Sequence, residues 1–255
     1  MKRARRCALI LLVIGAPAHA GALHLRWNAC LGDGGAVNRS FACDTNDGRE
    51  TLVGSFVLAD DMKHVSGVEV LLDVVVAGDA LPAWWQFKNA GACRQGALTW
   101  STDVPANAEH CVDWGGGQAG GGLAGYKAGA FGASSARIIG VNAVPYNELS
   151  DLKANSEYFA FALALRHTGT AGKDACAGCR LGACIALRSI KLTTPVLAND
   201  RLLAPAPEDT SATADRRVTW QDGAGVVIPA GREKLDCSFS YRDRATPLDR
   251  LLALY

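Results

Sequence analysis

The stretch Val65–Phe87, VSGVEVLLDVVVAGDALPAWWQF, decides the fold. Valine is stiff at its first side-chain torsion and favours extended backbone, so this valine-rich run opposes a helix and predicts a strand. From Val68 to Val76 only Glu69 and Asp73 interrupt the apolar residues. A strand with one face in water would alternate more regularly. We therefore expect a strand that is covered on both faces over part of its length.

Two adjacent tryptophans, Trp84 and Trp85, follow Pro82 at the end of this stretch. Successive side chains of a strand point to opposite faces, so we expect one indole ring in the core and the other partly exposed. The exposed ring is either a platform for a sugar or a cover for the sheet edge. Together with Trp114, these two tryptophans are the predicted ligand-binding residues, and the predicted partner is a carbohydrate or another extracellular protein.

Residues 1–20, MKRARRCALILLVIGAPAHA, have the pattern of a secretory signal peptide: a basic start, an apolar stretch and a small-residue cleavage site ending at Ala20. The apolar stretch is too short to span a bilayer, and no later apolar run is long enough for a membrane helix. We expect an exported protein, periplasmic or extracellular, that begins near Gly21.

The charge balance argues against two classes of partner. The chain has 26 Lys and Arg against 25 Asp and Glu, and four of the basic residues lie in the expected signal peptide. The remainder is therefore acidic by three charges, which gives no electrostatic reason to expect binding to nucleic acid or anionic lipid.

Short apolar or alternating segments recur along the rest of the chain and predict an all-β protein. The expected strands are Leu23–Trp27, Glu50–Leu58, Ala97–Thr102, Ala136–Val144, Glu157–Arg166, Ile185–Leu192, Val218–Trp220 and Val226–Ile228. The expected connections are the glycine-rich Cys111–Tyr126, a helical turn within Asn147–Lys153, and the long surface segment Thr193–Arg216. We predict a single β-sandwich of the jelly-roll or immunoglobulin/cohesin-like type over residues 21–240. A tail over residues 241–255 should contain a short helix, because Thr246-Pro247 suits a helix start.

Eight cysteines follow the expected signal peptide: Cys30, Cys43, Cys93, Cys111, Cys176, Cys179, Cys184 and Cys237. An even number of cysteines in an exported chain predicts disulfides that staple its loops. Closure between nearest neighbours suggests Cys30–Cys43 and Cys93–Cys111. Either Cys176 or Cys179 then pairs with Cys184, and the other pairs with Cys237.

The motif Cys176-Ala-Gly-Cys179, followed by Cys184, has four interpretations. A haem attachment site would need a histidine directly after the second cysteine, where this chain has Arg180. The favoured one is a hairpin tip stapled by disulfides. A structural zinc site would use these three cysteines with Cys237. A redox pair would need its first cysteine at a helix N-terminus, whereas the flanking segments here are predicted strands.

The run Asp44-Thr45-Asn46-Asp47-Gly48 gathers carboxylate and amide oxygens. Such oxygens suit calcium, which makes Asp44, Asn46 and Asp47 weak candidate ligands. The position of the glycine does not match a calcium-binding loop of the EF-hand type. We therefore favour a tight turn between two strands.

No catalytic motif accompanies these features. The four histidines after the expected signal peptide, His24, His64, His110 and His167, form no paired metal-binding motif, and no G-x-S-x-G sequence is present. A carboxylate pair for glycoside hydrolysis could come from Asp60, Asp61, Glu69 or Asp73, but their spacing gives no support. We expect a non-catalytic binding or structural module without a cofactor. The alternative is a secreted carbohydrate-active protein, or a metal or redox protein that uses the cluster Cys176, Cys179 and Cys184.

Four segments carry a resemblance to known proteins: LRWNACLGDGGAVNRSFAC, LPAWWQFKNAGACRQGAL, CVDW and CAGCRLGACIALRSIKL. This pattern is similar to a group of uncharacterised exported bacterial proteins, and it implies secretion and a stapled β fold without any catalytic residues. The ending RATPLDRLLALY departs from the Trp-Gly and Lys-Ala-Leu-Tyr pattern of that group. More distantly, the order of strands around LPAWW resembles cohesin-like sandwiches, which is a likeness of fold alone.

Overall fold

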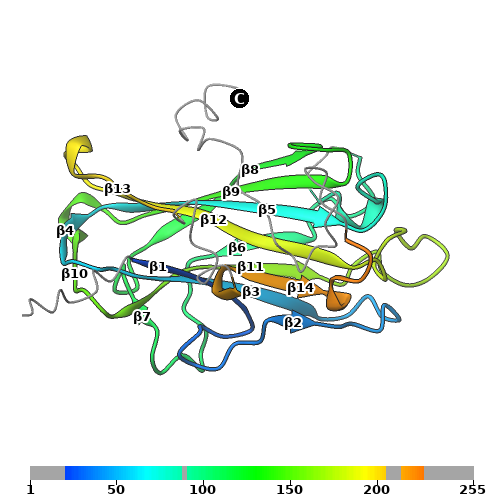
Figure 1. Ribbon diagram of the computed structural model, residues 1–255, viewed down its shortest axis with the longest axis horizontal. Coiled ribbons are helices and arrows are strands. Elements are labelled where there is room, and N and C mark those ends of the chain that lie inside the picture. The colour runs from blue at the N-terminus through cyan, green and yellow to red at the C-terminus, as the bar shows by residue number, and fades with distance from the viewer. Residues whose placement is uncertain (1–20, 88–90, 205–213, 227–255) are drawn as a thin grey trace, which may run out of the picture.

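The computed structural model describes residues 21–87, 91–204 and 214–226. In this part of the chain, β-strands form two main sheets that pack face to face, with short 3₁₀ turns in the connections (Figure 1). The predicted all-β sandwich is therefore confirmed. Among the described residues no helix is both long and apolar enough to cross a membrane. The expected helix in the tail lies outside the described residues.

The first sheet, sheet A, has the strand order β1-β3-β11-β6, and the short β7 pairs in parallel with β11. Its strands are β1 (Ala22–Trp27), β3 (Arg49–Val57), β6 (Leu98–Ser101), β7 (Val112–Asp113) and β11 (Glu157–Arg166). Strand β11 is central, because it pairs antiparallel with both β3 and β6.

The second sheet, sheet B, has the order β2-β14-β12-β5-β9-β8, and β13 pairs with β12. Its strands are β2 (Asn38–Arg39), β5 (Gly67–Val76), β8 (Gly120–Ala128), β9 (Ser135–Ala143), β12 (Ala183–Thr193), β13 (Arg201–Leu203) and β14 (Arg217–Trp220). A small separate sheet joins β4 (Met62–Val65) to β10 (Ser150–Leu152). The 3₁₀ turns are η1 (Ala83–Trp85), η2 (Tyr146–Glu148), η3 (Leu197–Asn199), η4 (Ala214–Arg216) and η5 (Gln221–Gly223).

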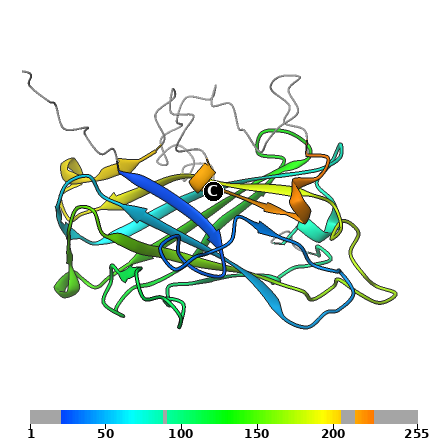
Figure 2. The same ribbon diagram turned by 60° about the horizontal axis from the view of Figure 1, so that its bottom comes forward.

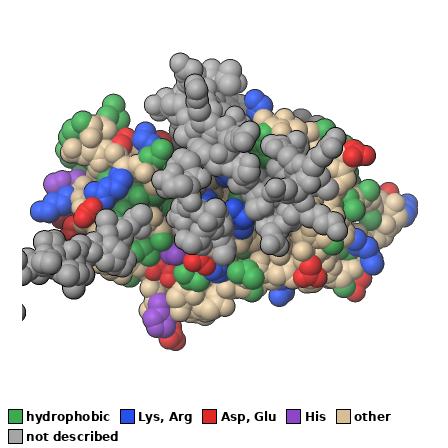
Figure 3. Space-filling model, in the orientation of Figure 1, with side chains coloured by type: hydrophobic (Ala, Val, Ile, Leu, Met, Phe, Trp, Pro, Cys, Tyr) green, Lys and Arg blue, Asp and Glu red, His purple; other side chains and the backbone are tan. Residues whose placement is uncertain are grey.

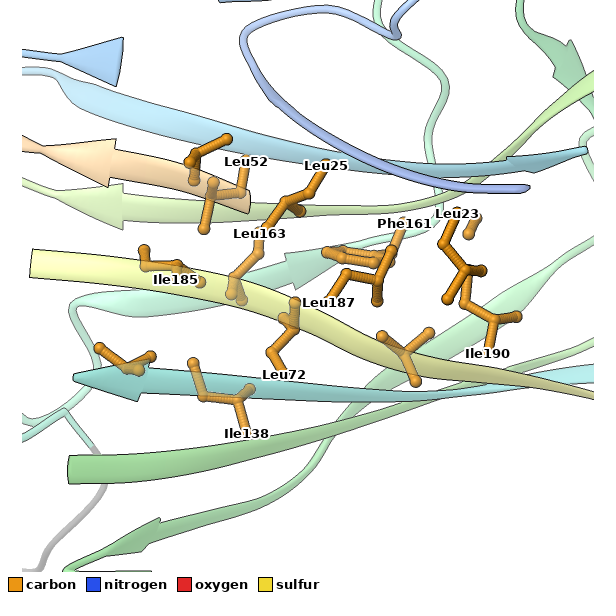
Figure 4. Close-up of a cluster of buried hydrophobic side chains, with 14 of the residues drawn as sticks. Leu23, Leu25, Leu52, Leu72, Ile138, Phe161, Leu163, Ile185, Leu187 and Ile190 are labelled. Carbon is orange, nitrogen blue, oxygen red and sulfur yellow. The ribbon is translucent and has the colours of Figure 1, made fainter. Parts of the chain in front are cut away.

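The core lies between the two sheets, as Figure 4 shows for side chains of both layers. Leu25, Leu52 and Leu163 from sheet A face Leu72 and Ile185 from sheet B in this view. Strand β5, which comes from the stretch that decides the fold, runs between β12 and β9, and all of its residues except Glu69 are buried. The prediction of a strand covered on both faces is confirmed.

The main differences from the sequence expectation concern segments with little side-chain pattern. The glycine-rich Cys111–Tyr126 is not a simple connection, because its second half belongs to β8, which pairs with β9. The expected helical turn in Asn147–Lys153 is replaced by η2 and β10. Within Thr193–Arg216 the structure contains η3, β13 and η4. Val226 is described but belongs to no strand, and 227–228 lie outside the described residues.

Between described residues, three disulfides join cysteines that are far apart in the sequence: Cys30–Cys111, Cys43–Cys179 and Cys93–Cys176. The nearest-neighbour pairs Cys30–Cys43 and Cys93–Cys111 are therefore wrong, and so is a bond from Cys176 or Cys179 to Cys184 or Cys237. The physical reason is that the folded sheets, and not loop length, decide which cysteines meet. Cys184 is also disulfide-bonded. Cys237 lies outside the described residues.

Two glycines leave space for a stack of aromatic rings between the sheets. Trp100 of β6 stacks on Phe161 of β11, with ring centroids 4.6 Å apart. A Cβ atom on Gly140 of β9 would collide with the Trp100 ring, and one on Gly54 of β3 would collide with Phe161.

We expect Gly140→Ala to lower the free energy of unfolding by about 1–3 kcal/mol, because the added methyl group overpacks this site. The measurement is urea denaturation. Gly120→Ala is the matched control, because Gly120 also lies in a strand of sheet B and an added Cβ there meets nothing within 4 Å. Equal stability of the two variants would contradict the predicted collision.

His24 on β1 gives the fold a predictable pH response. Its side chain is buried, and burial lowers its pKa below the usual 6.5. As the pH falls through 6.5, the unfolded chain takes up a proton at this position before the folded chain does, so the protein loses stability. We expect His24→Gln to flatten the decline in the urea midpoint between pH 7.5 and pH 5.5. The same decline in both proteins would contradict this role.

Candidate functional site

The predicted ligand-binding tryptophans lie in the core. Trp84 and Trp85 are both 0% exposed and Trp114 is 3% exposed, so none of the three offers a surface ring. The expectation of one exposed ring was wrong because this pair lies in the 3₁₀ turn η1 and not in a strand, so the two side chains do not alternate between faces. Trp84 stacks on Trp220 with centroids 5.1 Å apart and meets Trp85 edge to face.

A buried arginine fixes this aromatic cluster to the adjacent loop. The guanidinium carbon of Arg94 lies 3.5 Å from the centre of the Trp84 ring, which is a cation–π contact. Its nitrogens donate hydrogen bonds to the carbonyl oxygens of Trp84 (2.8 Å), Thr168 (3.0 Å) and Arg166. Burial lowers the pKa of Arg94, while these carbonyl acceptors and the ring face favour its charged form. Cys93, which directly precedes Arg94, forms a disulfide bond with Cys176.

The candidate calcium run forms one side of an interlocked pair of loops. The Asn46 side-chain oxygen accepts hydrogen bonds from the backbone N–H groups of Thr170 (2.7 Å) and Ala171 (3.0 Å), and its amide nitrogen donates to the Ala171 carbonyl. The backbone carbonyl of Asp47 lies 2.6 Å from Nδ1 of His167. These contacts give Asn46 a structural role in joining the loops. Asp44 is exposed, and neither it nor Asp47 belongs to a described cluster of three or more acidic, His or Cys ligands.

Between these loops lies an open pocket of about 390 Å³. It is lined by Asn46, Asp47, Gly48, Arg49, Arg166 and Thr168. The two arginines are directly opposite each other, because Arg49 of β3 is the register partner of Arg166 of β11. Both side chains are exposed, and within the described residues neither has a carboxylate within ion-pair distance. Like charges at opposite positions of neighbouring strands repel each other.

A buried polar group of Arg39, Glu50 and His167 lies beside this pocket. Glu50 is 4% exposed and is ion-paired to Arg39. His167, 5% exposed, stacks on Phe41 with ring centroids 3.8 Å apart, and its Nε2 lies 3.4 Å from a Glu50 oxygen. These groups connect the ends of β3 and β11, and they leave Arg49 and Arg166 as the two cations of the pocket, beside the Asp47 carboxylate.

The other sequence candidates do not form a second reactive site. Cys176, Cys179 and Cys184 are disulfide-bonded, so their sulfurs are neither zinc thiolates nor a Cys-X-X-Cys redox pair. Cys30 and Cys111 lie close to the Glu157 carboxylate, but they too are bonded to each other.

Three of the four carboxylates considered for glycoside hydrolysis, Asp61, Glu69 and Asp73, have cationic partners in the structure. Asp61 forms an exposed ion pair with Lys153 (2.8 Å), and the buried Asp73 is held by Arg137 (2.7 Å). Each is therefore part of a separate ion pair, and no two of these carboxylates share a described cluster of ligating groups.

Sequence reasoning singled out Asn46 and Asp47 for calcium and missed Arg49, Arg166 and Thr168. The available signal was an arginine at the end of each of two predicted strands, Glu50–Leu58 and Glu157–Arg166. Its meaning depends on the pairing of these strands, which are more than a hundred residues apart in the sequence. No family model matches this chain, and the comparison with curated proteins gives no match.

Proposed function

We propose that this protein is an exported, disulfide-stabilised and non-catalytic binding module that holds an anionic group between Arg49 and Arg166. The observation that carries the proposal is the pocket itself, in which two exposed arginines lie side by side and neither is ion-paired with a carboxylate of the described residues. A guanidinium group presents a fork of N–H donors that fits carboxylate, sulfate or phosphate oxygens. An anion bound between them would also relieve the repulsion between the two positive charges.

The structure around the pocket supports a binding role because it is preorganised. Arg94 and the Cys93–Cys176 disulfide fix the loop that carries Arg166 and Thr168, and Asn46 fixes the opposite loop. A ligand that binds such a site loses less energy to ordering the protein. The lining contains one carboxylate, from Asp47, and the rest of its polar groups suit hydrogen bonding to a polyhydroxylated ligand.

The ligand class that fits best is an acidic extracellular polysaccharide, such as a polymer of uronic acid. The pocket provides charge and hydrogen-bond donors, whereas the tryptophans that would stack on a neutral sugar are buried. Export is supported by the pattern of residues 1–20 and by the three long-range disulfides.

We expect the protein to bind polygalacturonate and not the neutral polymer amylose in affinity electrophoresis, and to bind less well as salt increases. Arg49→Ala/Arg166→Ala should weaken binding at least about tenfold, since it removes two charge-assisted contacts. The control Lys127→Ala/Arg180→Ala removes the same net charge from two exposed residues outside the pocket. Equal loss in both double variants would mean diffuse charge attraction and would overturn the proposed site.

A further inference from the structure

The three disulfides between described residues differ in how far solvent reaches them. Cys93 is exposed, whereas its partner Cys176 is 5% exposed. The cysteines of the other two bonds are buried or half-buried: Cys30, Cys43, Cys111 and Cys179. A thiolate breaks a disulfide by attacking one of its two sulfurs, so the reaction depends on an approach to that sulfur. Among these three bonds, Cys93–Cys176 is therefore the one that an external thiol reaches most readily.

Packing protects the other two bonds. Cys30 and Cys111 lie in an apolar cluster that includes Phe159. Cys179 belongs to the main core between the sheets. An external thiol can attack sulfurs in such surroundings only after part of the structure opens. Reduction of these three bonds in the folded protein should therefore begin at Cys93–Cys176.

This exposed disulfide joins a loop at one end of the sandwich. The connection between β11 and β12, residues 167–182, projects at the right-hand end of Figure 1, and Figure 2 shows it projecting there from a second direction. In Figure 3 this end of the molecule is an open surface that carries both acidic and basic side chains. The sulfur of Cys93 lies 4.0 Å from the backbone carbonyl oxygen of Asp174, which belongs to this loop. A partner protein can therefore approach the disulfide from the end of the sandwich.

Gly169 connects the disulfide to the anion pocket. Its φ is +73°, and a Cβ atom at this position would lie 2.9 Å from Sγ of Cys176 and 3.3 Å from Cγ of Arg94. The backbone N–H of Cys176 also donates a hydrogen bond to the Gly169 carbonyl (2.8 Å). Gly169 directly follows Thr168, which lines the pocket. A change at the disulfide is therefore only one residue away from the pocket.

We propose that Cys93–Cys176 is a site of thiol–disulfide exchange with an exported protein dithiol of the Cys-X-X-Cys class, and that its opening weakens anion binding. The first thiolate of the dithiol attacks Sγ of Cys93, which forms a mixed disulfide and releases Cys176 as a thiolate. The second thiolate then attacks the first within the mixed disulfide and releases Cys93. The dithiol supplies two electrons and two protons and ends as a disulfide, and Cys93 and Cys176 end as thiols. The effect on binding rests on the proposed function, whereas the exchange does not.

The opening is expected to be local, because other contacts still hold the loop. The Asn46 side-chain oxygen accepts the backbone N–H of Thr170 (2.7 Å), and the Ala177 carbonyl accepts the backbone N–H of Trp84 (2.9 Å). Neither contact involves the disulfide. The segment between them, which contains Cys176, should therefore become more mobile while the sandwich stays folded.

The exchange is tested by incubating the full-length oxidised protein with reduced thioredoxin, followed by alkylation with iodoacetamide and digestion with trypsin. Trypsin releases Cys93 in the peptide 89–94, NAGACR, which contains a single cysteine. We expect Cys93 to be alkylated at least about tenfold faster than Cys30, Cys43 and Cys111, because access limits the attack. Equal rates, or earlier alkylation of one of those three cysteines, would overturn the exchange site.

The effect on the pocket is tested on the selectively reduced protein by hydrogen–deuterium exchange and by affinity electrophoresis with polygalacturonate. We expect the amides of residues 169–176 to exchange at least about threefold faster and the Kd to rise about threefold, and reoxidation should reverse both changes. Cys30→Ala/Cys111→Ala is the control, because it removes a bond that lies in a separate cluster and should leave both readings unchanged. Unchanged exchange and affinity in the reduced protein would overturn the regulatory role. If the oxidised protein did not bind polygalacturonate, the proposed function and its regulation would both be wrong, while the order of alkylation would still decide the exchange site.

Discussion

Replacing Arg94 with alanine is expected to lower the free energy of unfolding by about 3–5 kcal/mol, the largest effect of a single substitution that we predict. The side chain is 2% exposed, and it donates hydrogen bonds to three backbone carbonyl groups while it covers the Trp84 ring. Its removal leaves the three carbonyls without their donor and creates a cavity beneath the loop at residues 166–170. Both consequences destabilise the folded state.

Two further substitutions separate the contributions of Arg94. Arg94→Met keeps much of the packing volume but no donor, and Arg94→Lys keeps the charge without the planar fork. We expect urea midpoints in the order wild type, Lys, Met, Ala. Near-ultraviolet circular dichroism should report the change at the stacked Trp84 and Trp220. If Arg94→Met were as stable as the wild type, the hydrogen bonds to the carbonyls would contribute little.

Removal of the Cys43–Cys179 disulfide is the second large effect. Its cysteines are 136 positions apart, but the bonds Cys93–Cys176 and Cys30–Cys111 shorten the loop that it closes in the unfolded chain. The shortest remaining path between the two cysteines is about 35 residues, for which the chain-entropy relation gives about 4 kcal/mol. We expect Cys43→Ala/Cys179→Ala to lose about this much in urea denaturation, with the other disulfides intact.

The Cys43–Cys179 bond also lies close to the pocket, so its removal should affect binding as well as stability. Cys43 is close to Phe41, whose ring stacks on His167, and His167 contacts the carbonyl of the pocket residue Asp47. The Cys179 carbonyl accepts a hydrogen bond from the indole N–H of Trp220. The double variant should therefore also bind the anionic polymer less well. A variant that lost stability but kept full binding would show that the pocket does not depend on this staple.

The fold could be predicted from sequence wherever side chains form a pattern. Valine-rich β5 and the alternating β1 and β11 lie close to their expected bounds, because β-branched and alternating residues favour a sheet with a buried face. Strand β8 was missed because GGGLAG has almost no side chains to form a pattern. Its glycines are nonetheless suited to the strand: a Cβ on Gly121 would collide with the Val141 carbonyl of β9.

The disulfides and the tryptophans show where local reasoning fails. Nearest-neighbour pairing minimises the loop closed in the unfolded chain, but Cys43 and Cys179 meet because the pairing of β3 with β11 brings their flanking loops together. Strand alternation was applied to Trp84 and Trp85, whereas the turn after Pro82 directs both rings inward. In each case the missing information was a tertiary contact.

Only part of the pocket could be predicted from the sequence. The polar run at Asn46 and Asp47 was recognised as a turn with ligand-like oxygens, and it does line the pocket. Arg166 and Thr168 could be added only with the register of β3 against β11. Two arginines that lie opposite each other on paired strands depend on how the strands pair, so no short sequence motif can reveal them.

The order of the cysteines has a consequence for biosynthesis. A chain that enters an oxidising compartment N-terminus first presents Cys30 and Cys43 together, long before Cys111 and Cys179 arrive. In the folded protein, however, Cys30 and Cys43 are not bonded to each other. The loop closed by Cys30–Cys111 overlaps in sequence with the loops closed by Cys43–Cys179 and Cys93–Cys176. Bonds made in order of arrival would therefore be wrong, and thiol–disulfide exchange would have to rearrange them. The yield of native protein should depend on a disulfide isomerase more than on an oxidase.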